Sequence, residues 1–486
     1  MDQKELQELC KNKPDGFIQI AFNESLWDYQ RDITYSIRDN KVTAVKSCNG
    51  IGKSYIAARL ALWFLYTYPD SKVITTAPTA KQVRDVLWRE IRSAKSKSVL
   101  PLSGQLNQMS LDLSEEWFAL GLSTDKPDRF QGFHAEHILL IVDEAAGVAE
   151  DIFVASDGIV TSQGAKVLYI GNPTNTAGTF YNSFRLEGVS KMTVSAFDTP
   201  NFTKFGIMLD DIRTGQWLEK IDDALPAPYL ITPEWVADKY KKWGENTPMW
   251  SARVMGEFPQ QGDNTLIPLY KIELARNTNI QILDTDPEVI GADFARFGTD
   301  KTEYCYRKGS AVLDWKTLTK IDTVINAGEL GLFMNFHPGA SVNADEGGLG
   351  VGIVDMVKQN NPMKTVNGVN SSSEPDDKES FANLRAEMFW ALRDRFMNGG
   401  MDLSKLPQDV YDDLSAQLSN INYKFTPRGQ RLIESKEEMK SRGVQSPDKA
   451  DSLCLAFGNV QSNRSANSFL EGLKGWSTPY FGGIHA

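Results

Sequence analysis

The sequence predicts an α/β protein in which two working parts follow one another along the chain. At 486 residues it exceeds one ordinary domain of about 100–200 residues. In the first half, short apolar runs alternate with helix-length segments, a pattern typical of a parallel sheet covered by helices. A second group of strands and helices begins near residue 286. We therefore expect two α/β domains.

The elements of the first half follow in order from these runs. Stretches rich in Val, Ile and Leu between polar turns predict strands, and the longer segments between them predict helices. We expect strands at residues 41–47, 72–77, 137–145 and 166–172, and helices at residues 54–68 and 79–96.

The second half predicts a strand, a hairpin, and a strand that runs into a helix, at residues 288–294, 303–318 and 340–360. Residues 256–271 are rich in Gly, Pro and Gln and are the best candidate for a linker, and the end of the chain predicts a loosely docked tail. The expected divisions are 1–30 for an N-terminal segment, 31–255 for the first domain, 256–285 for the linker, 286–461 for the second domain and 462–486 for the tail.

The composition is that of a globular chain with a large core. It is 41% hydrophobic and 24% charged, which excludes wholesale disorder. The apolar stretch at residues 56–66 contains Arg59 and is shorter than the roughly 18 apolar residues of a membrane span. The charged N-terminus lacks the apolar segment of a secretory signal, so we expect a cytosolic protein without membrane contact. Reduced thiols are expected for the four widely spaced cysteines, Cys10, Cys48, Cys305 and Cys454.

The segment between the first strand and the first helix ends in Gly-Lys-Ser and matches a phosphate-binding loop. Gly50 and Gly52 let backbone N–H groups turn toward phosphate oxygens. Lys53 is placed to reach the β and γ phosphates, and Ser54 is suited to Mg²⁺. A glycine turn before an ordinary helix is the structural alternative. The predicted nucleotide-contacting residues of this loop are Ser47, Cys48, Asn49, Gly50, Ile51, Gly52, Lys53 and Ser54.

Two acids end the strand at residues 137–145. Ligands of open α/β sheets bind at the carboxyl ends of the strands, which is where Asp143 and Glu144 stand. Asp143 is suited to hold the Mg²⁺ that bridges the phosphates, and Glu144 to orient or deprotonate the attacking water. Two solvated acids in a turn are the alternative. Together with the phosphate loop, the pair predicts nucleoside triphosphate hydrolysis.

Three further segments fit the same site with less specificity. Gln30, in the motif WDYQ, offers an amide to a nucleobase beside aromatic side chains, although a surface helix start has the same composition. Asn172, in the turn after the strand at 166–172, is placed to sense the γ phosphate, although an ordinary turn fits equally well. Arg129, in a loop flanked by Pro and Gly, is suited to an arginine finger, although a lone loop arginine is usually solvated.

Acidic residues mark the ends of the elements in the second half. Carboxylates brought together from strand ends and a helix form the paired Mg²⁺ or Mn²⁺ sites that cleave phosphodiesters. Each aspartate taken singly suits helix capping or a turn. The predicted metal ligands of this half are Asp293, Asp300, Asp345, Asp448 and Asp451.

The formal charge of −11 argues against tight binding to a polyanion, but local basic runs modify that argument. Six basic residues face two acidic ones in residues 81–97, and six face three in residues 424–442. Either run also suits a solvated helix face. The second precedes Asp448 and is a reasonable clamp for DNA.

The succession of motifs resembles the large terminase subunit of tailed bacteriophages over roughly residues 25–460. The motifs that carry the resemblance are, in order, WDYQ, SCNGIGKS, APTAKQV, PDRFQGFH, ILLIVDEA, GNPTN, GEFP, GADFARFGTDK, NADEGGLGVGIVD and IESKEEMKSRGVQSPDKADSL. The resemblance implies a P-loop ATPase domain of the additional-strand, catalytic-glutamate type with a small lid, followed by a ribonuclease H-like nuclease domain. It implies ATP with Mg²⁺ at the first site and two Mg²⁺ or Mn²⁺ ions at the second.

The resemblance also assigns roles by position. Glu144 matches the catalytic acid, Asp143 the metal-binding acid of the ATPase and Gln30 the adenine contact. Asn172 opens the match to the coupling motif, and Arg129 matches a loop arginine that acts on a neighbouring subunit's ATP. The matches to the nuclease metal ligands are Asp293, Asp345 and Asp451, with Asp300 and Asp448 as secondary acids.

The implied function is ATP-driven translocation of viral double-stranded DNA into a procapsid, together with endonucleolytic cleavage of the concatemer. The implied partners are a portal protein, a small terminase subunit and further copies of the chain in a ring on the portal. The expected location is the cytoplasm of the infected bacterial host, outside the mature virion. A helicase-nuclease of repair or recombination is the alternative enzyme, and a nucleotide-dependent scaffold is the non-catalytic one.

Overall fold

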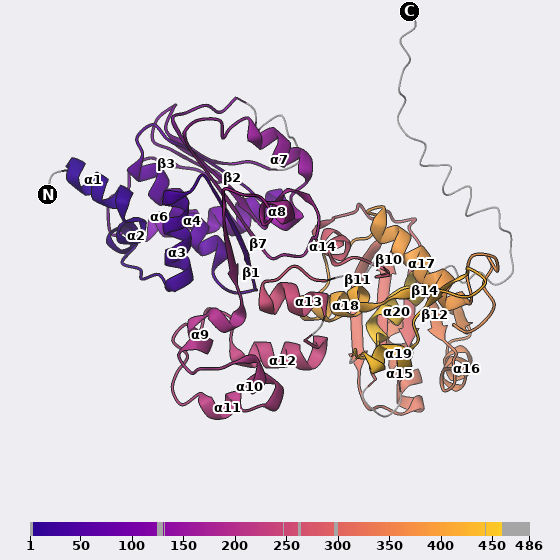
Figure 1. The fold of residues 1–486 in the computed structure, drawn as a ribbon. Coiled ribbons are helices and arrows are strands. Elements are labelled where there is room, and N and C mark those ends of the chain that lie inside the picture. Colours follow the sequence, from indigo (N-terminus) through magenta and orange to yellow (C-terminus); the bar gives the residue numbers. More distant parts are fainter. Residues whose placement is uncertain are drawn as a thin grey trace, which may run out of the picture.

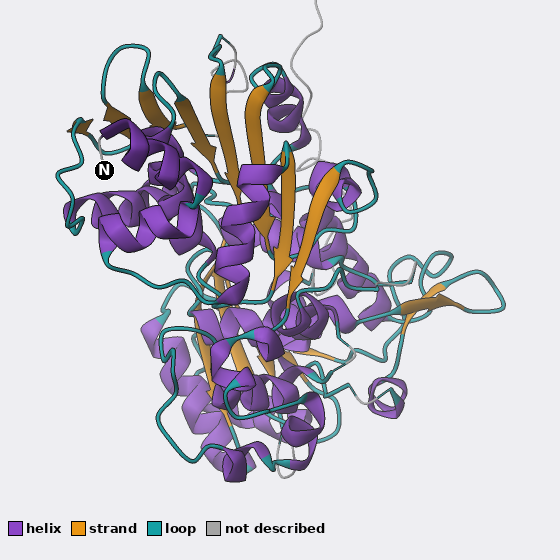
Figure 2. Cartoon of the chain, turned by 60° about the vertical axis from the view of Figure 1, so that its left-hand side comes forward, coloured by secondary structure: helices purple, strands orange, loops and turns teal. Residues whose placement is uncertain are grey.

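The computed structural model describes residues 3–123, 130, 132–245, 247–260, 264–295, 300–442 and 444–458. These residues form two α/β halves, each built on its own sheet (Figure 1). In Figure 2 the two sheets occupy the upper and lower parts of the molecule, and helices flank each of them. Within the described residues, no helix is long and apolar enough to cross a membrane.

The first half contains an eight-stranded sheet in the order β3-β4-β5-β2-β6-β7-β1-β8. The six strands from β5 to β8 are parallel, whereas β3 and β4 pair antiparallel. Strand β7 lies between β1 and β6, so an additional strand separates the phosphate-loop strand from the acid-bearing strand. The fold class expected for the first domain is confirmed. The strands are β1 (Val42–Ser47), β2 (Lys72–Thr76), β3 (Gln105–Leu106), β4 (Ser110–Asp112), β5 (Phe118–Gly121), β6 (His137–Asp143), β7 (Gly164–Gly171) and β8 (Val189–Val194).

Helices cover both faces of this sheet. Alternate residues of β6 serve different cores: Leu139 and Ile141 pack on one side, and Leu140 and Val142 on the other. The long apolar run of β6 is explained by this burial on both faces. The first core is covered by α1 (Gln3–Asn12), α2 (Pro14–Phe22), α3 (Asp28–Asp39), α4 (Lys53–Thr67) and α6 (Trp88–Ser96), and the second by α7 (Glu150–Asp157) and α8 (Gly178–Ser183).

A small helical subdomain follows β8 and lies below the sheet in Figure 1. Its last helix continues into a π-helical turn, Ser251–Met255, which returns the chain to the phosphate loop. The helices are α9 (Pro200–Thr203), α10 (Leu209–Thr214), α11 (Trp217–Lys220), α12 (Pro233–Trp243) and α13 (Pro248–Trp250).

The second half contains a five-stranded sheet in the order β11-β10-β9-β12-β13. Strand β10 runs antiparallel to both of its neighbours, and β9, β12 and β13 are parallel. This is a ribonuclease H-like sheet, as expected. The strands are β9 (Glu288–Asp293), β10 (Thr302–Lys308), β11 (Ala311–Leu318), β12 (Ser341–Asp345) and β13 (Val366–Val369).

The helices of the second half fall into two layers. One core holds α15 (Thr323–Phe336) and α16 (Gly350–Asn360), and the other holds α14 (Leu269–Asn277), α17 (Leu384–Met397), α18 (Gln408–Asn420) and α20 (Asp448–Phe457). A separate hairpin of β14 (Tyr423–Phe425) and β15 (Arg431–Ile433) precedes α19 (Lys436–Ser441).

The range expected as a linker, 256–285, contains ordered structure. Leu266 and Ile267 are fully buried in the second core, and α14 packs there as well. The apolar side chains of this range therefore join the second half, and the exact domain boundaries remain predictions.

Candidate functional site

The phosphate loop connects β1 to α4 through two left-handed glycines, Gly50 with φ +65° and Gly52 with φ +82°. A side chain at Gly52 would place its Cβ 2.8 Å from Gln30 Nε2, so only glycine fits. The side chains of Cys48 and Ile51 are buried in the core, and burial raises the pKa of Cys48 to about 12. The loop can therefore face a phosphate with its backbone but not with these two side chains.

Two loop amides are already engaged within the protein. Cys48 N donates to Val194 O at 2.8 Å, and Asn49 N donates to Arg253 O at 2.9 Å. These bonds anchor the start of the loop to β8 and to the turn after α13. Amides further along the loop are the ones left to cradle an anion.

Lys53 joins three segments that are distant in sequence. Its Nζ lies 3.2 Å from Asn172 Oδ1 and 3.7 Å from Glu144 Oε1. Asn172 in turn donates from Nδ2 to Ser47 O at 2.6 Å. The predicted lysine, catalytic acid and sensor residue thus meet at the carboxyl ends of β1, β6 and β7, as the parallel sheet requires.

Ser54 Oγ donates a 2.8 Å hydrogen bond to Asp143 Oδ2. Burial and the neighbouring Glu144 raise the pKa of Asp143 to about 6, although Ser54 and Lys53 act in the opposite direction. A buried hydroxyl and carboxylate beside a lysine form the oxygen donor set that Mg²⁺ with a nucleotide prefers. The residues present therefore fit that cofactor.

Glu144 adopts a left-handed backbone, with φ 48° and ψ 45°, that non-glycine residues rarely accept. The strained turn lies against β7, where a Cβ at Gly171 would come within 2.9 Å of Ala145 N. Glu144 is held at the sheet edge with a partly exposed side chain, whereas Asp143 is buried. The two acids occupy the different environments that metal binding and water activation need.

Gln30 and Arg129 have different outcomes. The Gln30 side chain is buried and donates from Nε2 to Ile51 O at 3.3 Å, so its amide contacts the phosphate loop. Trp27 and Tyr29 pack against each other with ring centroids 5.6 Å apart. Arg129 lies outside the described residues.

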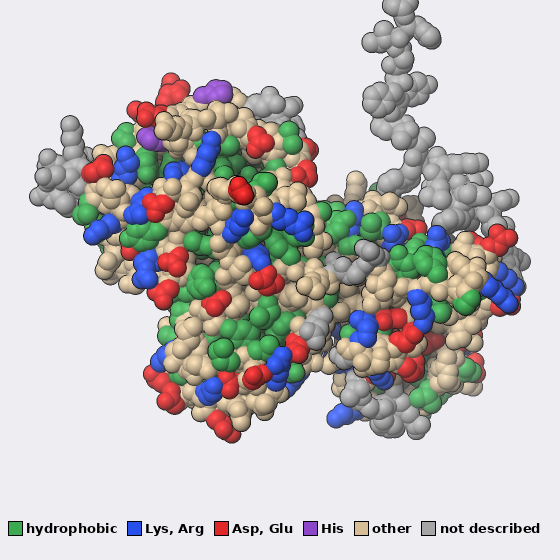
Figure 3. Space-filling model, viewed as in Figure 1, with side chains coloured by type: hydrophobic (Ala, Val, Ile, Leu, Met, Phe, Trp, Pro, Cys, Tyr) green, Lys and Arg blue, Asp and Glu red, His purple; other side chains and the backbone are tan. Residues whose placement is uncertain are grey.

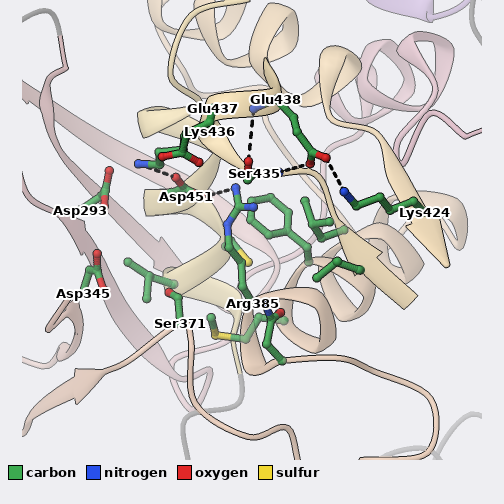
Figure 4. Close-up of a pocket in the computed structure, with 17 residues that line it drawn as sticks. Asp293, Asp345, Ser371, Arg385, Lys424, Ser435, Lys436, Glu437, Glu438 and Asp451 are labelled. Atoms are coloured by element: carbon green, nitrogen blue, oxygen red, sulfur yellow. Dashed lines mark hydrogen bonds and ion pairs between the residues drawn. The ribbon is translucent and has the colours of Figure 1, made fainter. Parts of the chain in front are cut away.

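A second site is a cavity of about 470 Å³ in the other half. Asp293 from the end of β9, Asp345 from the end of β12 and Asp451 from α20 line it, together with Arg385 and Lys436 (Figure 4). The predicted strand-end and helix carboxylates are thus brought to one place.

The carboxylates of this cavity differ in charge environment. Asp451 lies 3.1 Å from Arg385 Nη2 and 3.0 Å from Lys436 Nζ, and these two cations outweigh its burial and lower its pKa. Burial is the main cause that raises the pKa of Asp293 well above its usual range, and neighbouring aspartates including Asp451 add to it. Burial also raises the pKa of Asp345. Asp293 and Asp345 therefore favour an added cation.

Asp448 is engaged differently from Asp451. Its carboxylate accepts hydrogen bonds from Lys301 N at 2.7 Å and from Ser446 Oγ, and it does not line the cavity. Asp300 lies near enough to raise the pKa of Asp448, after burial as the main cause. The geometry favours Asp451 over Asp448 as the third cavity carboxylate.

The cavity carboxylates are all oxygen donors, which suits Mg²⁺ or Mn²⁺. Among the described residues, however, no three Asp, Glu, His or Cys side chains already converge as a closed metal cluster. The Lys436 ammonium instead lies against Asp451 in this arrangement. The residues fit the predicted metals in kind, and the number of ions remains a prediction.

Sequence reasoning missed Arg385. It stands 66 residues from Asp451, on α17, outside every motif that marks the site. Only the packing of α17 against α20 brings the two together.

The two basic runs are used differently. In the first, Arg84 pairs with Asp85, and Arg92 and Lys95 bond to backbone carbonyls. In the second, Lys424 of the β14–β15 hairpin borders the carboxylate cavity and pairs with Glu438. On the face shown in Figure 3, Lys and Arg are interspersed with Asp and Glu.

Comparison with known proteins supports the resemblance expected from the sequence. No family model matches. A protein of Enterobacteria phage P7 named "Probable terminase, large subunit" is 23% identical over 456 residues, covering 89% of this chain and 87% of that protein. The chain therefore resembles a large terminase subunit along most of its length.

Solved structures similar to this chain carry related names. The nuclease domain of the large terminase subunit gp2 of bacterial virus Sf6 is 22% identical, with 40% of this chain and 98% of that one covered and a TM-score of 0.37. A full large terminase from a thermophilic bacteriophage is 9% identical, with 90% and 99% covered and a TM-score of 0.39. The nuclease domain has also been solved with manganese, and the thermophilic phage protein in complex with ADP.

Proposed function

We propose that this chain is the large subunit of a phage terminase, an ATP-driven DNA translocase joined to a metal-dependent endonuclease. One observation carries the proposal: a single chain holds a phosphate loop wired to Asp143, Glu144 and Asn172, and also a separate carboxylate cavity. The similarity to the phage P7 protein over 456 residues supports the same assignment.

At the first site, the protein's own groups bind, orient and transfer protons. Bound Mg²⁺ with ATP would supply charge neutralisation at the phosphates, with Ser54 and Asp143 holding the metal. Lys53 is placed to contact phosphate oxygens, and Glu144 to accept a proton from water. Asn172 touches both Lys53 and the loop backbone, so it is placed to report a change at the phosphates to β7.

At the second site, Asp293, Asp345 and Asp451 would hold Mg²⁺ or Mn²⁺, which supplies an activated water and stabilises the cleaved phosphate. Lys424 and the hairpin beside the cavity offer positive charge to a DNA backbone. The substrate under this proposal is double-stranded DNA. The partners are a portal protein, a small terminase subunit and further copies in a ring, in the cytoplasm of the infected host.

The fold favours a translocase over the alternative helicase-nuclease. A helicase of the usual kind needs a second nucleotide-binding α/β domain after the first. The described residues from Pro200 to Gly256 form only short helices, with no strand among them. DNA-dependent ATP hydrolysis without strand separation is the expected behaviour.

Purified chain with plasmid DNA and Mn²⁺ tests the assignment. Wild type should nick the plasmid, and Asp293→Asn should not, while both hydrolyse ATP. Lys53→Ala should show the reverse, with nicking retained and hydrolysis lost. Wild type that neither nicks nor hydrolyses would support the scaffold, and unwinding of a short duplex would support the helicase.

A further inference from the structure

Arg253 spans the phosphate loop and a helix that belongs to the other half. It lies in the π-helical turn Ser251–Met255. Its backbone oxygen accepts from Asn49 N at 2.9 Å, and its Nη1 donates to Asn49 Oδ1 at 3.2 Å. Its Nη2 donates to Glu273 Oε1 at 2.5 Å. One side chain therefore joins the loop to Glu273.

The Arg253–Glu273 pair is largely shielded from water, since the two side chains are only 14% and 18% exposed. Burial alone would lower the pKa of Arg253, but Glu273 and neighbouring acids outweigh it, so the guanidinium stays charged. Removing Glu273 would leave that charge without its partner. The position of Arg253 therefore depends on Glu273.

Glu273 belongs to α14, whose other contacts lie on both sides of the molecule. Ile272 and Ala275 of α14 are buried in the core of the second half, and the helix packs on α17 and α18. The same helix contacts the turn Ala145–Gly147, which directly follows Glu144. Figure 1 shows α14 between the two halves. Helix α14 is thus linked to both catalytic loops of the first site.

The chain between Arg253 and the loop has no slack. A Cβ at Gly256 would come 2.4 Å from Val194 O and 3.0 Å from Cys48 N, the pair that anchors the start of the loop. Any movement of the loop must therefore move the turn that carries Arg253, because interiors this tightly packed do not deform locally.

We propose that Arg253 is a positioning residue of the phosphate loop and that Glu273, on a helix of the second half, sets its position. Nucleotide affinity is then controlled in part by α14. This inference rests on the proposed function of the loop as an ATP site. It assigns a residue outside every nucleotide motif to the tuning of that site.

The test is a double-substitution cycle on ATP hydrolysis with Arg253→Gln and Glu273→Gln. Both residues contact the loop side of the site and not its reacting groups, so KM should rise about tenfold while kcat changes less than about twofold. Because the two residues act through one contact, the double variant should show no larger KM than either single one. Arg253→Lys keeps the charge without the fork and should fall between wild type and Arg253→Gln.

Leu274→Ala is the matched control, since Leu274 lies beside Glu273 on α14 and is 45% exposed. Nicking with Mn²⁺ at the wild-type rate verifies that each variant is folded. Should Arg253→Gln fail to fold, Glu273→Gln and Arg253→Lys carry the comparison. A wild-type KM in Glu273→Gln, or KM changes that multiply in the double variant, overturns this inference alone. Absence of hydrolysis in wild type would instead overturn the proposed ATPase.

Discussion

Lys449 Nζ lies 2.9 Å from Glu303 Oε1 in a region from which water is excluded, with side-chain exposures of 4% and 0%. Glu303 also accepts hydrogen bonds from Trp315 Nε1 and Thr317 Oγ1. Lys449 belongs to the first turn of α20, the helix that also carries Asp451. The buried pair therefore fixes the end of α20 that brings its carboxylate to the cavity.

Glu303→Ala should destabilise the chain strongly, because it leaves the Lys449 charge buried without its partner. The free energy of unfolding should fall by about 3–5 kcal/mol, measured by urea denaturation. Glu374→Ala is the control: its pair with Lys378 is exposed, and the change should stay below about 1 kcal/mol. Equal shifts in the two variants would contradict the role given to the buried pair.

Asp451→Asn and Asp448→Asn should separate the two candidates for the third metal ligand. Asp451 lines the cavity, whereas Asp448 bonds to Lys301 N and Ser446. Nicking with Mn²⁺ should fall more than about 100-fold in Asp451→Asn and about tenfold in Asp448→Asn, as for a group that orients a ligand. The opposite order of severity would make Asp448 the ligand.

Lys436→Ala should lower the metal concentration needed for nicking. The Lys436 ammonium lies 3.0 Å from Asp451 Oδ2, so it competes with a divalent cation for that carboxylate. Removing a partly exposed ion pair of about 1 kcal/mol should lower the half-maximal Mn²⁺ concentration about fivefold. Lys440→Ala, an exposed residue of the same helix, should leave it unchanged. A higher metal requirement in Lys436→Ala would refute the competition.

Glu144→Gln should lower ATP hydrolysis by about 100-fold or more, since it removes the proposed proton acceptor. Nucleotide binding, followed by displacement of a fluorescent analogue, should be retained because Lys53, Ser54 and Asp143 remain. Lys41→Ala, on the exposed surface before β1, is the control and should hydrolyse at the wild-type rate. Hydrolysis at that rate in Glu144→Gln would exclude the role.

Glu24→Gln should destabilise the chain in a pH-dependent way. Burial alone would raise the pKa of Glu24, but hydrogen bonds from Arg59 and Tyr55 outweigh it and hold the pKa below its usual 4.5. The carboxylate therefore stabilises the fold above pH 4.5, and this contribution is lost as the pH falls through the native pKa. Urea midpoints of wild type and variant should differ at about pH 7 and converge below about pH 4. Glu115→Gln, at an exposed position, should show no such convergence.

Several elements escaped prediction for identifiable reasons. The strands β3, β4 and β5 are only two to four residues long, too short for an alternating pattern to stand out. Strand β8 is only partly buried at the sheet edge and mixes polar with apolar residues. The helix expected at residues 79–96 is present but interrupted by a π-helical segment, Val83–Leu87. Local patterns carry no information about such a change of winding.

The sequence by itself determined the α/β class, the phosphate loop, the acid pair after β6 and the carboxylates at the ends of β9 and β12. These depend on short-range patterns, since strand ends and glycine turns are written in consecutive residues. Only the tertiary structure decided that Arg385 and Lys436 flank Asp451, that Asp448 bonds to Lys301, and that Arg253 links the loop to Glu273. The hydrogen bonds made by Arg385, Asp448 and Arg253 join residues between 20 and 204 positions apart. Helix packing and side-chain reach create such contacts, and no local pattern encodes them.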